Sequence, residues 1–297
     1  QGSTTTLTTG QLVNSGRLQG ESLVVNVAGE LNNTGSGVLL SQNTLGVTAD
    51  TLKNQGILQG SGETSVTGTS RVQNDGSLLS GSKLTLTTPE LSVSSTGLVQ
   101  GVTLLLSAVT AVNSGRIIAT GNAELRGATL SNSGTLQGAD LLVGYRNLSS
   151  SGTVLGTSSL TVKGDTVTNL ASGKLFSTGN LLLDSQTFDS EGQVVSLGDV
   201  TLNLIGSLTH SGTLAAARSL TVTSQNAITN NRVMQGNTLS LTAGGAFTNN
   251  GTLTTGDGRG TFSANSILLN ASGSLQAGGD VQLTSRGDIT VNGFAGT

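Results

Sequence analysis

The stretch Asn14–Gly20 reads NSGRLQG, and Asn132–Gly138 reads NSGTLQG. Weaker versions of the same heptapeptide lie between and after them, for example NSGRIIA at 113–119 and HSGTLAA at 210–216. Aligned on the glycine, the copies form fourteen registers that step by 18 to 22 residues, with Arg232 in the glycine place of one copy. The other register positions are Gly16, Gly37, Gly56, Gly76, Gly97, Gly115, Gly134, Gly152, Gly173, Gly192, Gly212, Gly251 and Gly273. So constant a step predicts a repeat architecture built by stacking similar units.

The residues that follow each register position alternate in character. Two positions after it, all fourteen residues are aliphatic or Met, and four positions after it, all fourteen are small. The positions between them carry outward-facing types such as Arg17 and Gln19. Alternation with a period of two predicts a β-strand with one buried face.

Two further apolar slots accompany this strand in most units. An alternating pair such as Leu23 and Val25 follows the glycine, and a single apolar residue such as Leu52 or Val93 lies four residues before it. Each unit therefore contains three short strands separated by turns rich in Gly, Ser, Asn and Asp. We predict an all-β fold, a right-handed parallel β-helix of about fourteen coils, because parallel crossovers are almost always right-handed.

The Asn-Ser-Gly tripeptide is predicted to form a corner that recurs once per coil. Glycine permits backbone conformations that other residues resist, and asparagine tolerates left-handed geometry while its amide caps the backbone. We expect asparagines of successive coils, Asn54 with Asn74 and Asn113 with Asn132, to stack as an amide ladder. The residues assigned to this structural corner are Asn14, Gly16, Asn54, Gly56, Asn74, Gly76, Asn113, Gly115, Asn132, Gly134, Asn249 and Gly251.

Composition narrows the class of protein. The chain has 297 residues, with 13 Lys and Arg against 16 Asp and Glu, and this balance argues against nucleic acid as a partner. It contains no Cys, which excludes disulfides and thiolate metal sites. Its longest apolar run, 102–112, is too short to span a bilayer. Since its first residues do not resemble a secretion signal, we expect a segment cut from a longer polypeptide.

The recurring N-S-G-x-L-Q-G/A, followed by L-x-V/L, resembles the haemagglutinin repeats of filamentous haemagglutinin, and the resemblance extends from Leu12 to Gly293. Such repeats occur in bacterial exoproteins of two-partner secretion, including adhesins and contact-dependent growth-inhibition toxins. The resemblance implies a secreted, cell-surface filament that crosses the outer membrane unfolded through a partner transporter. The chain departs from the repeat pattern at three places. Arg232 replaces a register glycine, His210 replaces a corner asparagine, and residues 256–260 form an insertion.

Three functions remain open on the sequence alone. The leading one is a structural stalk, formed by a single repeat domain over 1–297, that presents a binding or toxic region to target cells. The second is that this segment itself binds a protein receptor on the target cell, as part of the filament does in growth-inhibition members. The third is a carbohydrate-active β-helix enzyme.

The enzyme reading is disfavoured because the acidic residues are dispersed. The densest set, Asp184, Asp189, Glu191 and Asp199, spans more than half a coil and need not converge. The lone His210 has no Ser, Cys or Asp arrangement beside it and cannot alone build a zinc site. We therefore expect no catalytic residue, no cofactor and no metal.

A few residues are candidates for contact with a partner. Arg286, Gly287 and Asp288 spell a tripeptide that some integrins recognise, although a turn rich in Gly and Asp produces it by chance. Asp257 and Arg259 lie in the 256–260 insertion, a lengthened turn that would project from the surface. Phe176 and Tyr145 are predicted to be exposed rings, whereas Phe188 and Phe247 fall in inner slots and should be core.

Overall fold

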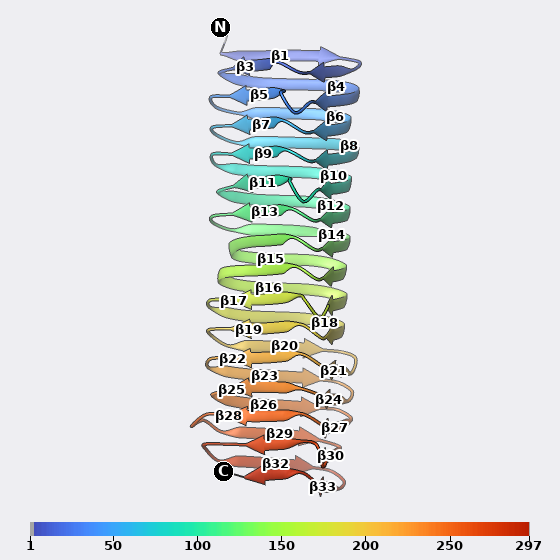
Figure 1. Ribbon diagram of the computed structural model, residues 1–297, viewed down its shortest axis with the longest axis vertical. Coiled ribbons are helices and arrows are strands. Elements are labelled where there is room, and N and C mark those ends of the chain that lie inside the picture. The colour runs from blue at the N-terminus through green and yellow to red at the C-terminus, as the bar shows by residue number, and fades with distance from the viewer. Residues whose placement is uncertain (1–2, 297) are drawn as a thin grey trace. The chain divides into compact units, whose positions relative to one another are not determined.

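A computed structural model describes residues 3–296, and all regular structure within that range is β-strand. By their internal contacts the residues divide into two compact units, 1–145 and 146–297. Each unit is a solenoid in which every strand pairs in parallel with the equivalent strand of the next turn. Within each unit in Figure 1, successive turns descend while the longer strands cross behind from left to right and the shorter strands return in front, which is a right-handed winding. The predicted right-handed parallel β-helix is confirmed.

In unit 1, a four-residue strand follows each register glycine from Gly16 to Gly115, and longer strands supply most of the rest of each turn. Gly134 is instead followed by a strand of 16 residues. The shorter strands are β2 (Leu12–Asn14), β3 (Arg17–Gly20), β5 (Val38–Ser41), β7 (Ile57–Gly60), β9 (Ser77–Ser80), β11 (Leu98–Gly101) and β13 (Arg116–Ala119). The longer strands are β1 (Thr4–Thr9), β4 (Ser22–Asn33), β6 (Leu45–Asn54), β8 (Thr64–Asn74), β10 (Lys83–Val93), β12 (Thr103–Asn113) and β14 (Ala123–Asn132), followed by β15 (Thr135–Ser150). The second and third predicted strands are separate in the first turn, as β1 and β2, and are merged from β4 onward in unit 1. A register shift marks the bend, for example between Val27 and Glu30.

In unit 2, the second and third strands separate after β18, as the sequence predicts. The strands are β16 (Thr153–Asn169), β17 (Lys174–Ser177), β18 (Asn180–Ser190), β19 (Gln193–Ser196), β20 (Val200–Leu204), β21 (Leu208–His210), β22 (Thr213–Ala216), β23 (Ser219–Ser224), β24 (Ile228–Asn230), β25 (Val233–Gly236), β26 (Thr238–Ala243), β27 (Ala246–Asn249), β28 (Thr252–Thr255), β29 (Gly260–Ala264), β30 (Ser266–Leu269), β31 (Ser274–Gln276), β32 (Val281–Ser285), β33 (Ile289–Val291) and β34 (Phe294–Gly296). A strand begins directly after each of the fourteen predicted register positions, and β34 adds one more after Gly293.

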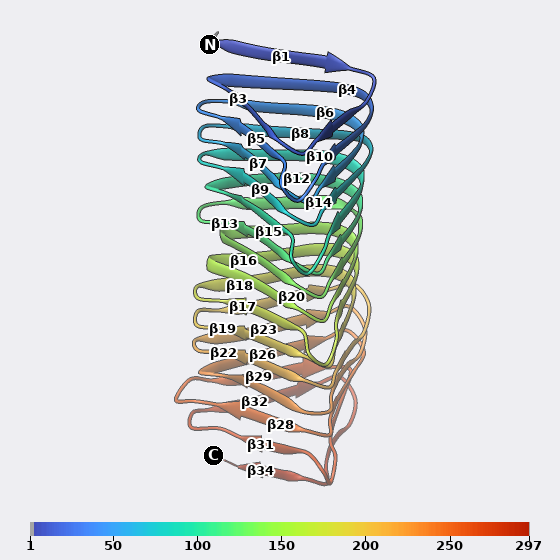
Figure 2. The same cartoon turned by 45° about the horizontal axis from the view of Figure 1, so that its top comes forward.

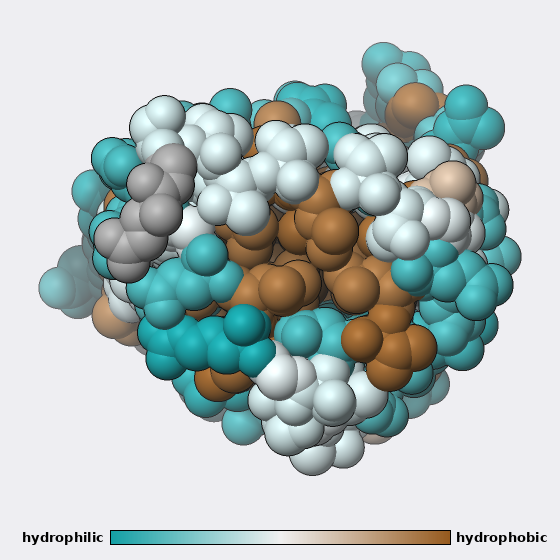
Figure 3. Space-filling model, turned by 90° about the horizontal axis from the view of Figure 1, so that it is seen from above, coloured by the Kyte–Doolittle hydropathy of each residue, from teal (hydrophilic) through white to brown (hydrophobic). Residues whose placement is uncertain are grey.

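The core of each unit consists of the predicted inner slots. Two positions after the register residue, Leu39, Leu136 and Leu214 are fully buried, and only Leu18 in the first turn is half-buried. Viewed from the N-terminal end, apolar side chains fill the centre and polar side chains form the rim (Figure 3). Burying one Leu or Val side chain contributes roughly 1.5–3 kcal/mol, so the stack of inner residues supplies the main stabilisation. Phe188 and Phe247 are core residues, as predicted, and Phe247 stacks on Phe262 with ring centroids 5.9 Å apart.

Four corners are two residues longer than the others, and this corrects one predicted slot. In these corners the register glycine donates its N–H to the carbonyl three residues earlier, as Gly37 does to Thr34 at 2.8 Å and Gly97 to Ser94 at 2.9 Å. The extra residues place Val93 opposite Asn74 and Asn113, in the asparagine position. Val93 therefore does not belong to the third apolar slot, which Leu91 fills in that turn. Leu269, also predicted in that slot four residues before its glycine, lies opposite Asn249, and Ile267 fills the slot instead. The other two long corners are Leu170–Gly173 and Asn270–Gly273.

Candidate functional site

The corner asparagines of unit 1 form a buried ladder of hydrogen bonds. Each lies at the end of a strand that precedes a register glycine, so that parallel pairing brings it directly opposite the asparagine of the next turn. Both predicted pairs are present. The side-chain amide bonds are Asn14 to Asn33 at 2.8 Å, Asn33 to Asn54 at 2.8 Å, Asn54 to Asn74 at 2.7 Å and Asn113 to Asn132 at 2.8 Å.

Each ladder amide also bonds the backbone of the next turn. Asn54 Nδ2 donates to the carbonyl oxygen of Ser77 at 3.0 Å, and Asn74 Nδ2 donates to that of Leu98 at 3.0 Å. Each acceptor carbonyl belongs to the residue that directly follows the register glycine of the next turn. Because buried amides are costly unless they are bonded, these contacts satisfy the asparagines and fasten neighbouring corners together.

The ladder of unit 1 is interrupted at the long corner that ends in Gly97. Val93 occupies the asparagine position there and is fully buried. Asn113 Oδ1, in the next turn, has no hydrogen-bond partner among the described residues. The interruption thus leaves one buried acceptor unsatisfied.

In unit 2 the ladder position holds several different polar residues, and the buried Leu269 occupies it opposite Asn249. Asn169 donates to Ser190 at 3.2 Å, and Asn230 donates to Asn249 Oδ1 at 2.8 Å. His210, which is fully buried, lies between Ser190 and Asn230. Its Nε2 lies 3.1 Å from the carbonyl oxygen of Val233, the first residue of the next turn's short strand.

His210 therefore replaces the donor function of an asparagine. A carbonyl oxygen only accepts, so Nε2 carries the proton in the neutral ring, and Nδ1 has no partner among the described side chains and backbone. Burial lowers the pKa of His210, while backbone hydrogen bonds to Val233 and Gly212 oppose this shift in part. The imidazole is thus a neutral structural group in a buried corner, in agreement with the prediction of a polar corner residue.

The register glycines are needed because successive turns lie close together. Within residues 3–296 no glycine or other residue has a positive φ, so the predicted left-handed geometry is wrong. A Cβ built on Gly56 would instead overlap the carbonyl oxygen of Gly37, and one on Gly134 would overlap that of Gly115. The first register glycine, Gly16, has nothing within 4 Å of such an atom.

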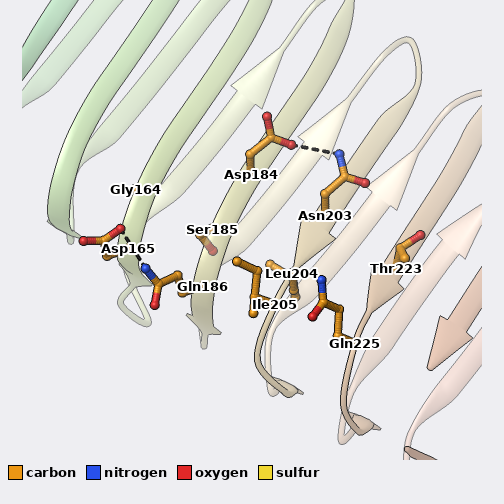
Figure 4. A pocket seen from close by; sticks show the side chains of 10 residues that line it. All are labelled: Gly164, Asp165, Asp184, Ser185, Gln186, Asn203, Leu204, Ile205, Thr223 and Gln225. Carbon is orange, nitrogen blue, oxygen red and sulfur yellow. Dashed lines mark hydrogen bonds between the residues drawn. The ribbon is translucent and has the colours of Figure 1, made fainter. Parts of the chain in front are cut away.

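A surface groove of about 460 Å³ lies on unit 2 (Figure 4). Asp165 accepts a hydrogen bond from Gln186 at 3.0 Å, and Asp184 accepts one from Asn203 at 2.8 Å. Ile205, 54% exposed, lies among them. The two carboxylates do not point toward one another, so the groove provides hydrogen-bonding groups and no acid–base pair. Its lining residues are Gly164, Asp165, Asp184, Ser185, Gln186, Asn203, Leu204, Ile205, Thr223 and Gln225.

The acidic residues considered as a possible catalytic set, Asp184, Asp189, Glu191 and Asp199, do not converge on one site. Asp184 faces outward beside Lys163 at 3.6 Å, and Asp199 pairs with Arg218 at 3.1 Å near a different corner. Among the described residues there is no group of three or more His, Cys, Asp or Glu side chains with metal-binding geometry. No helix long and apolar enough to cross a bilayer occurs within residues 3–296.

Two groups of predicted contact residues lie at separate places on unit 2. Arg286, Gly287 and Asp288 form an exposed turn between β32 and β33. Asp257 and Arg259 are exposed in the longer turn between β28 and β29, which projects to the left in Figure 1. Neither turn meets the groove.

The two aromatic candidates differ in exposure. Phe176 is half-buried on the outward side of β17, within a hollow of about 410 Å³. Tyr145 is only 1% exposed, so its prediction as an exposed ring is wrong. It continues the inward series of Leu141 and Val143, and its ring fills space that a Cβ on Gly127 would occupy. Burial raises the pKa of Tyr145 far above its ordinary range.

Three ladder asparagines were missed by reading the sequence from the glycine backwards. Asn33 and Asn169 lie four residues before their glycines because their corners are long, and Asn230 precedes Arg232, which has no glycine to mark it. The signal that identifies all three is the apolar residue two positions earlier, Leu31, Val167 and Ile228, because the third-strand alternation ends on the ladder residue.

These features define a class: right-handed parallel β-solenoids whose turns are encoded by a short sequence repeat and fastened by a polar corner ladder. The haemagglutinin repeat family matches residues 2–88, 176–258 and 256–293, and the chain belongs to this family of secreted, cell-surface exoproteins.

Long bacterial toxins contain similar segments. The chain is 58% identical over 270 residues to Toxin CdiA of Escherichia coli, covering 91% of the chain and 9% of that protein. It is 65% identical over 270 residues to 16S rRNA endonuclease CdiA of Enterobacter cloacae, covering 91% of the chain and 8% of that protein. It is 31% identical over 286 residues to Deoxyribonuclease CdiA of Dickeya dadantii, covering 96% of the chain and 7% of that protein. The chain thus spans less than a tenth of the length of these relatives. No solved structure matches it.

Proposed function

We propose that this chain is a structural stalk segment of a contact-dependent growth-inhibition exoprotein, which presents a toxic or binding region to target cells. One observation carries the proposal. Relatives whose names denote an rRNA endonuclease and a deoxyribonuclease share this segment at 65% and 31% identity. Because toxins with different named activities share this segment, the segment does not determine which activity each toxin has.

We infer that the nuclease activities named for the relatives belong to other parts of those proteins, and that this segment is not an enzyme. The regular turns support this inference, because the repeat fixes inner positions and corners while the outward positions vary. The same repeat continues in both compact units, which supports a single repeat domain over 1–297. A partner transporter in the outer membrane would export such a chain before it folds.

A segment exchange in the full exoprotein tests the proposal. Residues 3–296 are replaced by the matching segment of the Dickeya dadantii relative, and inhibition of a panel of target strains is measured. A stalk predicts the same target range with either segment, because only the fold is required. A target range that follows the exchanged segment would instead favour receptor binding by the remaining candidates Asp257, Arg259, Phe176 and the 286–288 turn.

The same exchange has an internal control. Secretion and surface display of both exoproteins are measured with an antibody against a region outside the segment. Equal display with lost inhibition of every strain would contradict a passive stalk. Release of product from polysaccharide or nucleic acid by the purified chain would contradict the inference that the segment lacks catalysis.

A further inference from the structure

One sheet face of unit 1 combines outward aliphatic and amide side chains. It is the face formed by the four-residue segments that follow the register glycines, and we call it the post-glycine face. Each segment directs two side chains outward, one and three residues after the glycine. The first column is Arg17, Val38, Ile57, Ser77, Leu98, Arg116 and Thr135, and the second is Gln19, Leu40, Gln59, Leu79, Gln100, Ile118 and Gln137.

The post-glycine face contains no carboxylate in either column, although the chain has 16 Asp and Glu. Most of its aliphatic side chains are only partly covered by their neighbours, whereas Ile118 is buried at 8% exposure. Ile57 is 39% exposed, and Leu40, Leu79 and Leu98 are half-buried. A face that lacks one sign of charge and exposes aliphatic side chains on several successive strands is typical of an interaction surface.

The second column reads the same in both directions. Amide and aliphatic residues alternate strand by strand from Gln19 to Gln137, and Leu79 is the central member. Such an order is self-complementary, because a two-fold axis through Leu79 places like residues opposite one another. An amide both donates and accepts hydrogen bonds, so amides also pair with their own kind.

Two symmetric arrangements bring the face against itself, and the side chains distinguish them. With the two-fold axis along β9, the solenoids run antiparallel, and Ile57 faces Leu98 while Leu79 faces Leu79. With the axis along the solenoid, the two columns face each other turn by turn, and Ile57 faces Gln59. The facing pairs of the antiparallel arrangement are Gln19 with Gln137, Leu40 with Ile118, Gln59 with Gln100, Leu79 with Leu79, Ile57 with Leu98, Ser77 with Ser77, Val38 with Arg116 and Arg17 with Thr135.

We propose that the post-glycine face of unit 1 is a self-association surface, which docks antiparallel onto the same face of a second copy about a two-fold axis at Leu79. Apolar pairs and amide pairs match along the interface. The one apolar–charged pair joins Val38 to Arg116, whose alkyl stem covers the valine while its guanidinium reaches water. No buried charge is left opposite a like charge.

The size of the face sets the strength of the contact. Seven segments of four residues, about 4.8 Å apart, present about 440 Å² on each copy. Two such faces bury less than the roughly 1,200 Å² of a stable specific interface. The association is therefore weak and reversible, with a monomer–dimer equilibrium that shifts with concentration.

Cysteine crosslinking tests both the contact and its orientation, since the natural chain has no Cys. Leu79→Cys places two thiols opposite each other at the two-fold axis, and Thr85→Cys on the neighbouring strand β10 is the control at a similarly half-buried outward position. Disulfide dimers of Leu79→Cys should form at least roughly tenfold faster than those of Thr85→Cys, because the contact raises the local thiol concentration. Equal rates would overturn the proposal.

Orientation is tested by mixing two variants. Gln19→Cys and Gln137→Cys should crosslink when mixed, and Gln19→Cys alone should not, because its mate lies at the other end of the interface. Crosslinking of Gln19→Cys alone as fast as the mixture would contradict the antiparallel arrangement. In sedimentation velocity at high concentration, Leu79→Glu should abolish the dimer and Thr85→Glu should leave it. A dimer that survives Leu79→Glu would also overturn the proposal.

Discussion

The side-chain nitrogen of Asn54 lies 2.7 Å from Oδ1 of Asn74, twenty residues later in the chain. The same nitrogen also donates to the backbone carbonyl of Ser77. One buried amide therefore ties its own turn to both the side chain and the backbone of the next. Because the amides repeat at the same place, the ladder fixes the register of the turns as well as closing the corner.

Replacement of Asn54 by alanine should destabilise the solenoid. The variant loses the bonds to Asn74 and Ser77, so that the buried Oδ1 of Asn74 loses its Asn54 donor, and Asn33 loses one of its acceptors. An unsatisfied buried polar group costs about 1–3 kcal/mol. Chemical denaturation followed by far-UV circular dichroism measures the loss. Gln55→Ala, at the exposed neighbouring position, is the control and should change the free energy of unfolding by less than about 0.5 kcal/mol. Equal effects of the two substitutions would show that the ladder does not stabilise the fold.

The glycine of each corner should tolerate alanine only where no turn lies against it. Gly56→Ala forces a Cβ into the carbonyl of Gly37, so the two turns must separate, and we expect a loss of about 2 kcal/mol or more, as for overpacking of a tight core. Gly16→Ala meets no atom within 4 Å and should be neutral or stabilise by about 0.4–1 kcal/mol through the unfolded state. The difference in unfolding free energy between the two variants is the measurement. A destabilised Gly16→Ala would argue for a conformational requirement instead.

The interrupted ladder predicts a stabilising substitution. Val93→Asn places an amide between Asn74 and Asn113, where its nitrogen donates to the unpartnered Oδ1 of Asn113. A satisfied hydrogen bond contributes about 0.5–1.5 kcal/mol, and the thermal midpoint should rise. Val112→Asn, at a position 43% exposed on the neighbouring strand, is the control and should be neutral. A fall in stability of Val93→Asn beyond the control would mean that this long corner excludes an amide.

The buried imidazole of His210 predicts a loss of stability in acid. Its pKa in the folded protein is lowered by burial, so the unfolded chain binds the proton more readily than the folded one. Stability is then complete above the unfolded pKa of about 6.5 and falls below it, by at most about 1.4 kcal/mol per pH unit until the folded pKa is passed. Its ladder neighbours Ser190 and Asn230 are uncharged.

His210→Asn restores the usual ladder residue and should flatten this part of the stability profile. Denaturation of both proteins between pH 7.5 and 5 isolates the contribution of His210, because the carboxylates titrate alike in the two proteins. An identical slope in both would show that the imidazole does not govern it.

Much of this fold follows from sequence because burial alone specifies it. Each turn must direct the same inner positions into a shared core, so the period, the strand after each glycine and the inner residues such as Leu39 are visible as a pattern. An alignment on the glycines cannot show how many residues separate the end of the preceding strand from the glycine. For that reason Val93 was placed in the wrong slot and Asn33 was overlooked.

Two further errors have physical causes of the same kind. Tyr145 lies beyond the expected strand end, but strand alternation continues past Val143 and turns it inward. Gly56 was explained by backbone conformation, whereas the cause is the carbonyl of the preceding turn, a contact between residues far apart in sequence. The groove at Asp165 and Asp184 was equally invisible, since it depends on which outward residues adjoin across turns.

The most direct test of the account removes one complete turn. Deletion of residues 38–56 joins Gly37 to Ile57, which occupies the place of Val38 in the next turn, whereas deletion of residues 38–47 removes half a turn and joins Gly37 to Thr48. The in-register deletion should retain the strand signal and a single cooperative unfolding transition, and the half-turn deletion should lose both. Equal tolerance of the two deletions, or collapse of the in-register one, would contradict a solenoid of interchangeable stacked turns.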